Sequence, residues 1–197
     1  MATPLTIRYE ETAFTLPWSH NRQDIHDQVY QVVLDGKNVP QHQKTRLFLY
    51  DAMPLDADAE LGLVTARAPA FGPHIESASN KLTVRPGDTL TLNLTVSATR
   101  KVRVDNGKRE QIVIDDDVPE WIGHLLARHA GVTVDDAVLV SRQNYTVRKP
   151  KMAFRVPVVK VRAVATVQDA PAFAKAFLNG VGRQKGYGTG LIEVVAT

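Results

Sequence analysis

The sequence contains no cysteine among its 197 residues. Disulfide bonds, thiolate metal ligands and cysteine nucleophiles are therefore excluded, and the absence is compatible with a reducing compartment. No stretch approaches the roughly 18 consecutive apolar residues that a membrane-spanning helix needs. Residues 1–8 also lack the apolar core of a signal peptide. We expect a cytoplasmic protein that has no membrane partner.

Aromatic residues are scarce as well, at 7%, whereas the hydrophobic fraction of 44% and the charged fraction of 23% are typical of a globular protein. The length is sufficient for two small hydrophobic cores or one large core. Among the 6 histidines no pair has a convincing metal-ligand spacing, since even His124 and His129 share no helical face. We therefore predict neither a metal site nor a cofactor.

Acidic residues are missing from residues 141–167, a stretch with many cations. Those cations are Arg142, Arg148, Lys149, Lys151, Arg155, Lys160 and Arg162. The net charge of +3 is also divided unevenly, because residues 1–99 carry 8 Lys and Arg against 11 Asp and Glu, and residues 100–197 carry 16 against 10. Unpaired cations repel one another, so the second half favours a nucleic-acid partner over an ordinary solvated strand pair.

The second half of the chain predicts the element order β-α-β-β-α-β. Residues 89–96 alternate apolar and polar side chains as a half-buried strand does, and residues 118–128 are typical of a helix with proline in its first turn. Strands are expected over 137–147 and 154–167. A helix capped by Asp169 and a strand over 191–195 complete the ferredoxin-like order.

The first half indicates the same order with weaker signals. Its strands are expected over 5–9, 47–50, 61–66 and 81–85, and residues 68–80 make a poor helix because they contain two prolines and a glycine. A helix is expected from the Asn21 cap to about Leu34, with Ile25, Val29, Val32 and Val33 on one face.

The predicted fold class is therefore α+β, with two tandem ferredoxin-like (RRM-like) domains and antiparallel sheets. The domain boundaries are 1–86 and 87–197.

Residues 180–190, between the last helix and the last strand, hold five of the 12 glycines. We call this segment the Gly-rich loop. Its glycines could let backbone N–H groups converge on a phosphate, or they could form an ordinary turn with no ligand. Its position in the basic half favours a support for an RNA backbone.

A tandem ferredoxin-like chain with this ending resembles a known family. The last helix, the motif Gly-hydrophobic-Gly-x-x-Lys-x-x-Gly-x-Gly at 180–190 and a short apolar strand are similar to those of the CRISPR repeat-processing endoribonucleases of the RAMP superfamily. The chain resembles the CasE branch of type I-E systems most, and type IV systems use relatives. The resemblance implies a protein that binds the hairpin of a CRISPR repeat transcript and cuts it without a metal. Such a protein often remains bound as a subunit of the effector complex.

The implied reaction requires few protein groups, because the ribose 2′-hydroxyl supplies the nucleophile. A base must accept its proton and an acid must protonate the departing 5′ oxygen. His26 occupies the helix position at which the resembled enzymes carry their catalytic histidine, although it could also be a boundary packing residue. His20 and Tyr30 are further candidates. Gln23 stands where some relatives place tyrosine, and an amide cannot donate a proton as a phenol can.

The RNA-binding residues that we predict are mostly basic and lie mostly in the second half. A double-stranded stem is recognised through its shape and its phosphates, for which Arg and Lys are suited. The residues are Arg22, Arg100, Lys101, Arg103, Lys108, Arg109, Arg142, Arg148, Lys149, Lys151, Lys160, Gly180, Gly182, Arg183, Lys185 and Tyr187.

The leading hypothesis is a CRISPR repeat endoribonuclease that leaves a 2′,3′-cyclic phosphate. The expected partners are the repeat RNA hairpin and other subunits of a CRISPR effector complex. Two alternatives stay open: a non-catalytic subunit that binds the hairpin, and a general ferredoxin-like RNA-binding protein. The last should carry RNP-type aromatic residues on its central strands, and this chain is too poor in aromatics.

Overall fold

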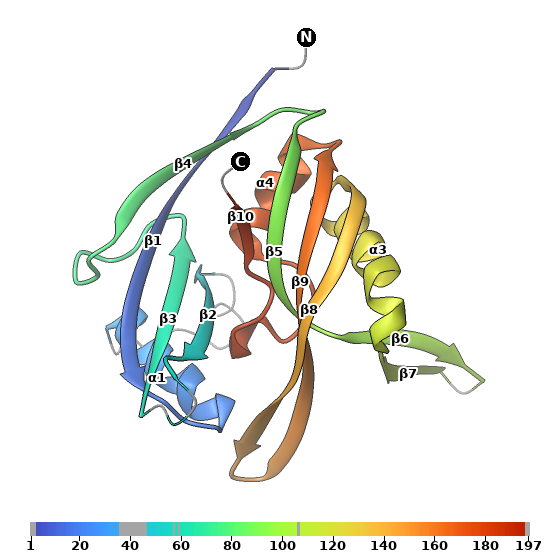
Figure 1. Ribbon diagram of the computed structural model, residues 1–197. Coiled ribbons are helices and arrows are strands. Elements are labelled where there is room, and N and C mark those ends of the chain that lie inside the picture. Colours follow the sequence, from blue (N-terminus) through green and yellow to red (C-terminus); the bar gives the residue numbers. More distant parts are fainter. Residues whose placement is uncertain (1–2, 36–46, 57, 59, 106, 196–197) are drawn as a thin grey trace.

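The computed structural model describes residues 3–35, 47–56, 58, 60–105 and 107–195. Within them the chain forms two four-stranded antiparallel sheets and a two-stranded hairpin (Figure 1). The first sheet has the order β2-β3-β1-β4 and the second the order β10-β5-β9-β8. Both orders are those of a ferredoxin-like sheet, so the predicted fold class is confirmed.

The first unit comprises four strands and one helix in its described part. The elements are β1 (Leu5–Pro17), α1 (Arg22–Leu34), β2 (Leu49–Pro54), β3 (Leu61–Ala68) and β4 (Ala78–Val84). Residues 69–77 contain no helix, so the second helix of the ferredoxin order is absent there. The strands are longer or shifted relative to the prediction, most clearly β1, which continues to Pro17 because it pairs with both β3 and β4.

The second unit has the complete order with a hairpin added. Its elements are β5 (Thr89–Ser97), β6 (Thr99–Val104), β7 (Gly107–Ile112), η1 (Asp115–Asp117), α3 (Val118–Ala130), β8 (Val132–Lys149), β9 (Met152–Val167), α4 (Ala170–Asn179), η2 (Lys185–Tyr187) and β10 (Ile192–Val195). The β6–β7 hairpin projects from the body, and its base is anchored where the Val113 amide donates to the Ala98 carbonyl at 2.9 Å (Figure 1).

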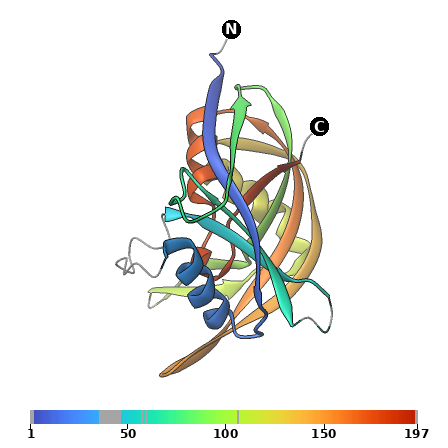
Figure 2. The same ribbon diagram turned by 90° about the vertical axis from the view of Figure 1, so that its left-hand side faces the viewer.

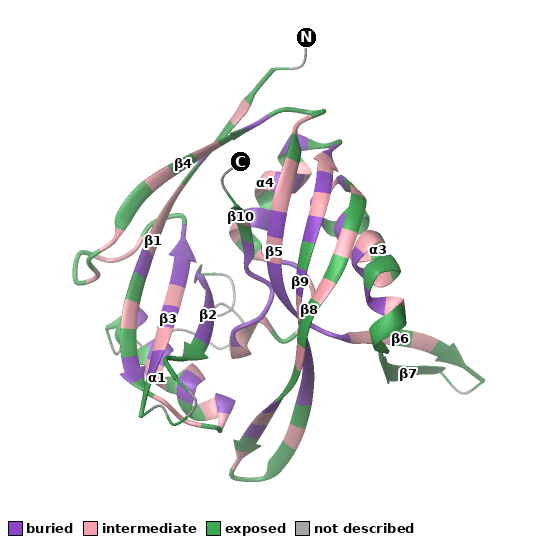
Figure 3. Cartoon of the chain, viewed as in Figure 1, coloured by how far each residue is buried: buried purple, intermediate pink, exposed green. Residues whose placement is uncertain are grey.

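Two main clusters of buried residues form the hydrophobic cores, and β1 and β4 contribute Ile7 and Val84 to the second cluster. In the first, α1 packs Ile25, Val29 and Val33 against the sheet, whereas the predicted inner residue Val32 is 41% exposed and lies on the outside. In the second, α3 and α4 cover the sheet, with Ile122 and Leu126 fully buried. Trp121 and Leu125 are partly buried and pack against the same core. Figure 3 shows this alternation of buried and exposed positions.

The lower end of the β8–β9 hairpin twists away from the second sheet and extends past α1, as Figures 1 and 2 both show. It carries a third cluster of buried side chains, formed by Tyr145, Val147, Val156 and Val158. Asn21, the N-cap of α1, bonds the backbone of Arg148, accepting from its amide at 2.8 Å. The start of α1 is thereby fixed to this hairpin.

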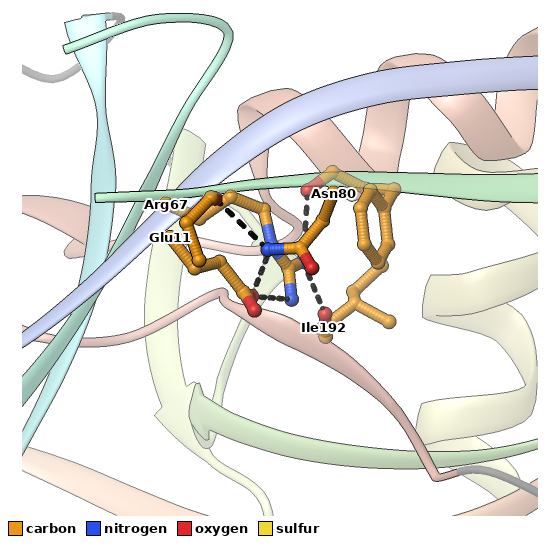
Figure 4. A network of polar contacts seen from close by, with 6 residues as sticks. Glu11, Arg67, Asn80 and Ile192 are labelled. Carbon is orange, nitrogen blue, oxygen red and sulfur yellow. Dashed lines mark hydrogen bonds and ion pairs between the residues drawn. The ribbon is translucent and has the colours of Figure 1, made fainter.

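One buried arginine joins the two units (Figure 4). Arg67 on β3 is 3% exposed, and its guanidinium donates to Glu11 on β1 and to the backbone carbonyl of Ile192 on β10. The guanidinium carbon also lies 3.7 Å from the centre of the Phe177 ring on α4. The segment that connects the units, residues 85–88, lies between β4 and β5, and the domain boundary at residue 86 stays a prediction.

Among the helices of the described residues, none has the length and apolar character that crossing a membrane requires.

Candidate functional site

The helix α1 begins where the sequence predicts, because the Asn21 side chain accepts a hydrogen bond from the Gln23 amide at 3.2 Å. Its apolar face meets the first sheet. Beside this apolar face lies a second row of side chains at four-residue spacing, which consists of Arg22, His26 and Tyr30. This row positions His26 at the contact between α1 and the Gly-rich loop.

His26 is half-buried, and its Nδ1 lies 2.5 Å from the carbonyl oxygen of Gly186. A carbonyl can only accept, so this contact assigns the ring proton of a neutral His26 to Nδ1 and the basic lone pair to Nε2. The rings of Tyr30 and Tyr187 flank the imidazole, with centroid distances of 4.2 Å and 5.7 Å. The loop and the helix therefore form one site, although 160 residues separate the two bonded groups.

Tyr50 on β2 donates its hydroxyl to the same Gly186 oxygen at 2.8 Å. The loop reaches this position because Gly188 has a φ of +78°, and a Cβ there would lie 3.2 Å from Cε2 of Tyr50. Nothing in the local sequence pattern of Tyr50 links it to a glycine 136 residues away, so this contact could not be predicted from the sequence.

The Gly-rich loop uses many of its polar groups to hold its own shape. The amides of Val181, Tyr187, Gly188 and Gly190 all donate to protein carbonyls. The ammonium group of Lys185 donates to the Asn179 carbonyl at 2.8 Å and so stabilises the end of α4. At these positions the expected phosphate cradle is replaced by internal bonds. Gly180 and Gly182, both at positive φ, stay predicted RNA contacts.

The other predicted residues of α1 are placed in three different ways. Arg22 is a correction to the predicted RNA-binding set, because it is only 4% exposed. Its guanidinium donates to the Ala52 carbonyl at 3.0 Å and lies 3.6 Å from the centre of the Tyr145 ring. Gln23 donates to Asp27 at 2.8 Å, and its buried Oε1 has no hydrogen-bond partner among the described residues. His20 is exposed just before the helix.

Tyr30 is 6% exposed, and burial raises the pKa of its phenol. A buried phenol with a raised pKa is a poor proton donor to an external substrate. Its ring packs against His26 on one side and against Phe48 on the other, with a centroid distance of 4.8 Å to Phe48. The structure therefore gives Tyr30 the position of a packing support for His26 rather than that of a second proton-transfer group.

The predicted cations fall into an exposed group and a group held by internal partners. The exposed group lies on the two projecting hairpins and consists of Lys101, Arg103, Lys108, Arg109, Arg148 and Lys151. In the second group, Arg100 pairs with Asp117 at 3.1 Å, Arg142 with Asp115 and Arg183 with Glu110. Lys149 is intermediate, with its Nζ 5.7 Å from the centre of the Tyr187 ring.

A hollow of about 360 Å³ lies between the two basic hairpins. Glu110 borders it on one side, Phe154 and Arg155 border it on the other, and Gln184 of the Gly-rich loop completes it. Phe154 also packs against Tyr187, with ring centroids 6.0 Å apart, and Tyr187 in turn contacts the ring of His26. A chain of ring contacts, from Phe154 through Tyr187, therefore connects the edge of the hollow to the imidazole of His26.

Lys160 is separate from that arrangement. It lines a cavity of about 180 Å³ between the two sheets, where its Nζ lies 3.9 Å from Oδ2 of Asp51. Burial raises the pKa of Asp51, and this effect outweighs the attraction of Lys160. The ammonium group of Lys160 thus has an internal acidic neighbour, which the sequence did not reveal.

The described residues contain no group of three or more His, Asp or Glu side chains that could hold a metal ion. The predicted absence of a metal site and of a cofactor stays a prediction.

Solved structures share this fold over nearly the entire chain. One is the CRISPR endoribonuclease Cse3 bound to a 19-nucleotide RNA, with a TM-score of 0.71 and 13% identity over 96% of this chain and 100% of that chain. Another is Cas6e from Escherichia coli K-12, with a TM-score of 0.68 and 14% identity over 97% and 100% of the chains. A chain of a CRISPR RNA-guided surveillance complex has a TM-score of 0.63 and 19% identity over 95% and 100%.

The sequence itself matches the family model described as CRISPR associated protein over residues 6–195. The chain belongs to this family. No curated protein matches the sequence. The match over nearly the entire length agrees with the resemblance that the Gly-rich loop and the element order indicate.

Proposed function

We propose that this chain is a CRISPR repeat endoribonuclease that binds a repeat hairpin and cuts it next to His26. The observation that carries the proposal is the pairing of His26 with the Gly186 carbonyl of the Gly-rich loop, beside two hairpins with exposed cations. Membership in the CRISPR associated protein family and the shared fold with Cse3 and Cas6e support it.

The proposed reaction uses the 2′-hydroxyl of the RNA as its nucleophile and no metal. The 2′ oxygen attacks the adjacent phosphorus, the bond from phosphorus to the 5′ oxygen breaks, and a 2′,3′-cyclic phosphate and a 5′-hydroxyl result. With its proton on Nδ1, neutral His26 can accept the 2′ proton at Nε2. An imidazolium could instead donate from Nε2 to the departing 5′ oxygen, so His26 can serve as the base or as the acid.

The phosphate is held by cations in this proposal. Lys149 is a candidate, since the ring of Tyr187 contacts both Lys149 and His26. A cation at this point would stabilise the charge that develops on the phosphate oxygens. His20 is our remaining candidate for the second proton transfer, because it is exposed just before the same helix, whereas Tyr30 is buried.

The RNA stem is proposed to lie along the exposed cations of the β6–β7 and β8–β9 hairpins. Both hairpins project from the second unit (Figure 1), and residues of both line the hollow that Phe154 borders. A product hairpin held by the same cations would remain bound, which is suited to a subunit of an effector complex. The fold shared with a chain of a surveillance complex supports this partner.

The test is incubation of the purified protein with a CRISPR repeat hairpin in EDTA. We expect two fragments, one ending in a 2′,3′-cyclic phosphate. His26→Ala should abolish cutting and leave RNA affinity nearly unchanged. His124→Ala, which removes an exposed histidine that pairs with Glu120 on α3, is the matched control and should cut normally.

RNA that is bound and left intact by the wild-type protein would indicate the non-catalytic binding subunit instead. Undiminished cutting by His26→Ala would refute the assigned role of His26.

A further inference from the structure

Two side chains from different elements meet at one backbone oxygen in the core of the site. His26 on α1 and Tyr50 on β2 both reach the carbonyl of Gly186, Tyr50 at 2.8 Å. A carbonyl oxygen has two lone pairs and can accept both bonds. The orientation of this single peptide group therefore determines whether Nδ1 of His26 faces a hydrogen-bond acceptor.

The Tyr50 hydroxyl is a permanent donor in this position. Tyr50 is 1% exposed, and burial raises the pKa of its phenol well above the ordinary value. The phenol therefore stays protonated across the range in which proteins work, and it always presents O–H to Gly186. A histidine would be a less constant donor, because neutral imidazole has a single N–H, whose position depends on the tautomer.

The ring of Tyr50 and its hydroxyl have separable tasks. The ring packs in the first core and contacts Phe48, with centroids 6.2 Å apart. A phenylalanine would fill the same space. Among the described residues, the hydrogen bond of the hydroxyl goes to Gly186. The loop lies so close to the ring that a Cβ at Gly188 would be 3.2 Å from it.

We propose that Tyr50 is a positioning residue for His26. By holding the Gly186 carbonyl, the Tyr50 hydroxyl keeps the imidazole proton on Nδ1 and the basic lone pair on Nε2. Tyr50 acts through Gly186 and touches no substrate atom. The consequence for cutting rests on the proposed role of His26, whereas the consequence for the tautomer of the ring does not.

The experiment compares Tyr50→Phe with the wild-type protein in two measurements. The first is the ¹⁵N spectrum of the histidine rings in RNA-free protein labelled with ¹⁵N-histidine, with His26 assigned by its loss in His26→Ala. The wild type should show His26 protonated at Nδ1, and Tyr50→Phe should show a mixture that includes the Nε2-protonated form. Tyr9→Phe is the control, since Tyr9 is a half-buried tyrosine that packs against Phe177 in the other core.

The second measurement is cutting of the repeat hairpin under single-turnover conditions, with RNA affinity measured in parallel. Tyr50→Phe should slow cutting roughly tenfold, a smaller loss than the about 10²–10⁴-fold that removal of a general base causes. Affinity should change less than about twofold, because the phosphate-binding cations of the hairpins are untouched. Tyr9→Phe should cut at the wild-type rate.

The spectrum decides the inference whatever the RNA assay gives. An unchanged His26 tautomer in Tyr50→Phe overturns the role of Tyr50, even if cutting slows. A shifted tautomer supports it, even if the wild-type protein cuts no RNA, and in that case the proposed function fails alone.

Discussion

At the scale of single residues, burial changes the role that we predicted for Arg22. The sequence placed Arg22 among the RNA contacts because of its charge and its position on the helix of His26. In the structure its guanidinium lies between the rings of Trp18 and Tyr145, at 4.9 Å and 3.6 Å from their centroids, and donates to the Ala52 carbonyl. Arg22 therefore joins α1 to the first sheet and to the β8–β9 hairpin.

Replacement of this arginine should reduce stability more than RNA binding. Arg22→Met keeps the volume of the side chain but leaves the Ala52 carbonyl without its donor and removes the cation–π contact. We expect a loss of about 1–3 kcal/mol in the free energy of unfolding, measured by urea denaturation. RNA affinity of the folded variant should stay within about twofold of the wild-type value, and a large loss of affinity with normal stability would restore the first interpretation.

The structure also changes the predicted role of the glycines in the Gly-rich loop. Density of glycine in residues 180–190 suggested a phosphate cradle. The structure shows a loop folded back on itself, in which the Gly190 amide donates to the Thr95 carbonyl at 2.6 Å and Gly188 allows a turn over Tyr50. The glycines are needed because the backbone of the loop approaches other atoms closely. This close packing positions the Gly186 carbonyl.

Among the elements, the two hairpins divide the predicted cations by accessibility. The β6–β7 hairpin is exposed over all of β7, and the end of β8–β9 carries Arg148 and Lys151 into solvent (Figure 3). Arg142, on the same strand β8, is turned toward Asp115 and the Val113 carbonyl. Neighbouring cations on one strand can therefore have different tasks.

The salt dependence of RNA binding should distinguish the exposed cations that contact RNA from the cations that pair within the protein. Arg148→Ala and Lys151→Ala should each weaken binding of the repeat hairpin and make the plot of log affinity against log salt shallower by about 1, because each exposed cation would release a counterion from one phosphate. Arg142→Ala is the control on the same strand and should alter stability more than the slope. An unchanged slope in both exposed variants would exclude the β8–β9 hairpin from the RNA-binding surface.

At the scale of the whole molecule, the relative position of the two units depends on the Arg67 cluster. The guanidinium is bonded to Glu11 in the first unit and to the Ile192 carbonyl in the second, and it stacks on Phe177 (Figure 4). His26 and the Gly-rich loop belong to different units as well. A cluster that fixes one unit against the other therefore also fixes the site.

The effect of this cluster can be measured with Arg67→Met. The variant leaves the Ile192 carbonyl and the partly buried Glu11 carboxylate without their donor, so we expect a loss of about 3 kcal/mol in the free energy of unfolding, the lower end of the range for broken buried pairs. Cutting should also slow, because the loop shifts relative to α1. Lys81→Met, on the exposed edge strand β4, is the control and should melt normally; equal melting of both variants would contradict the role of Arg67.

The sequence alone predicted the β-α-β-β-α-β order of the second unit. Alternation along β5, the Asp169 cap and the apolar end of the chain are local signals, and local signals specify local elements. The candidate His26 and its helix were also predicted, from the Asn21 cap and the family resemblance. The resemblance to the family could be recognised from the Gly-rich loop and from its position after the last helix.

Only the tertiary structure decided which of these parts meet. The contacts of Gly186 with His26 and Tyr50 span 160 and 136 residues, and no periodicity or spacing records a contact over that distance. Burial likewise divided the cations, placing Arg22 in the interior and Lys151 in solvent, because exposure depends on what the rest of the chain packs against each side chain. The sequence thus supplied the chemical groups, and the packing of two sheets against one loop gave them their geometry.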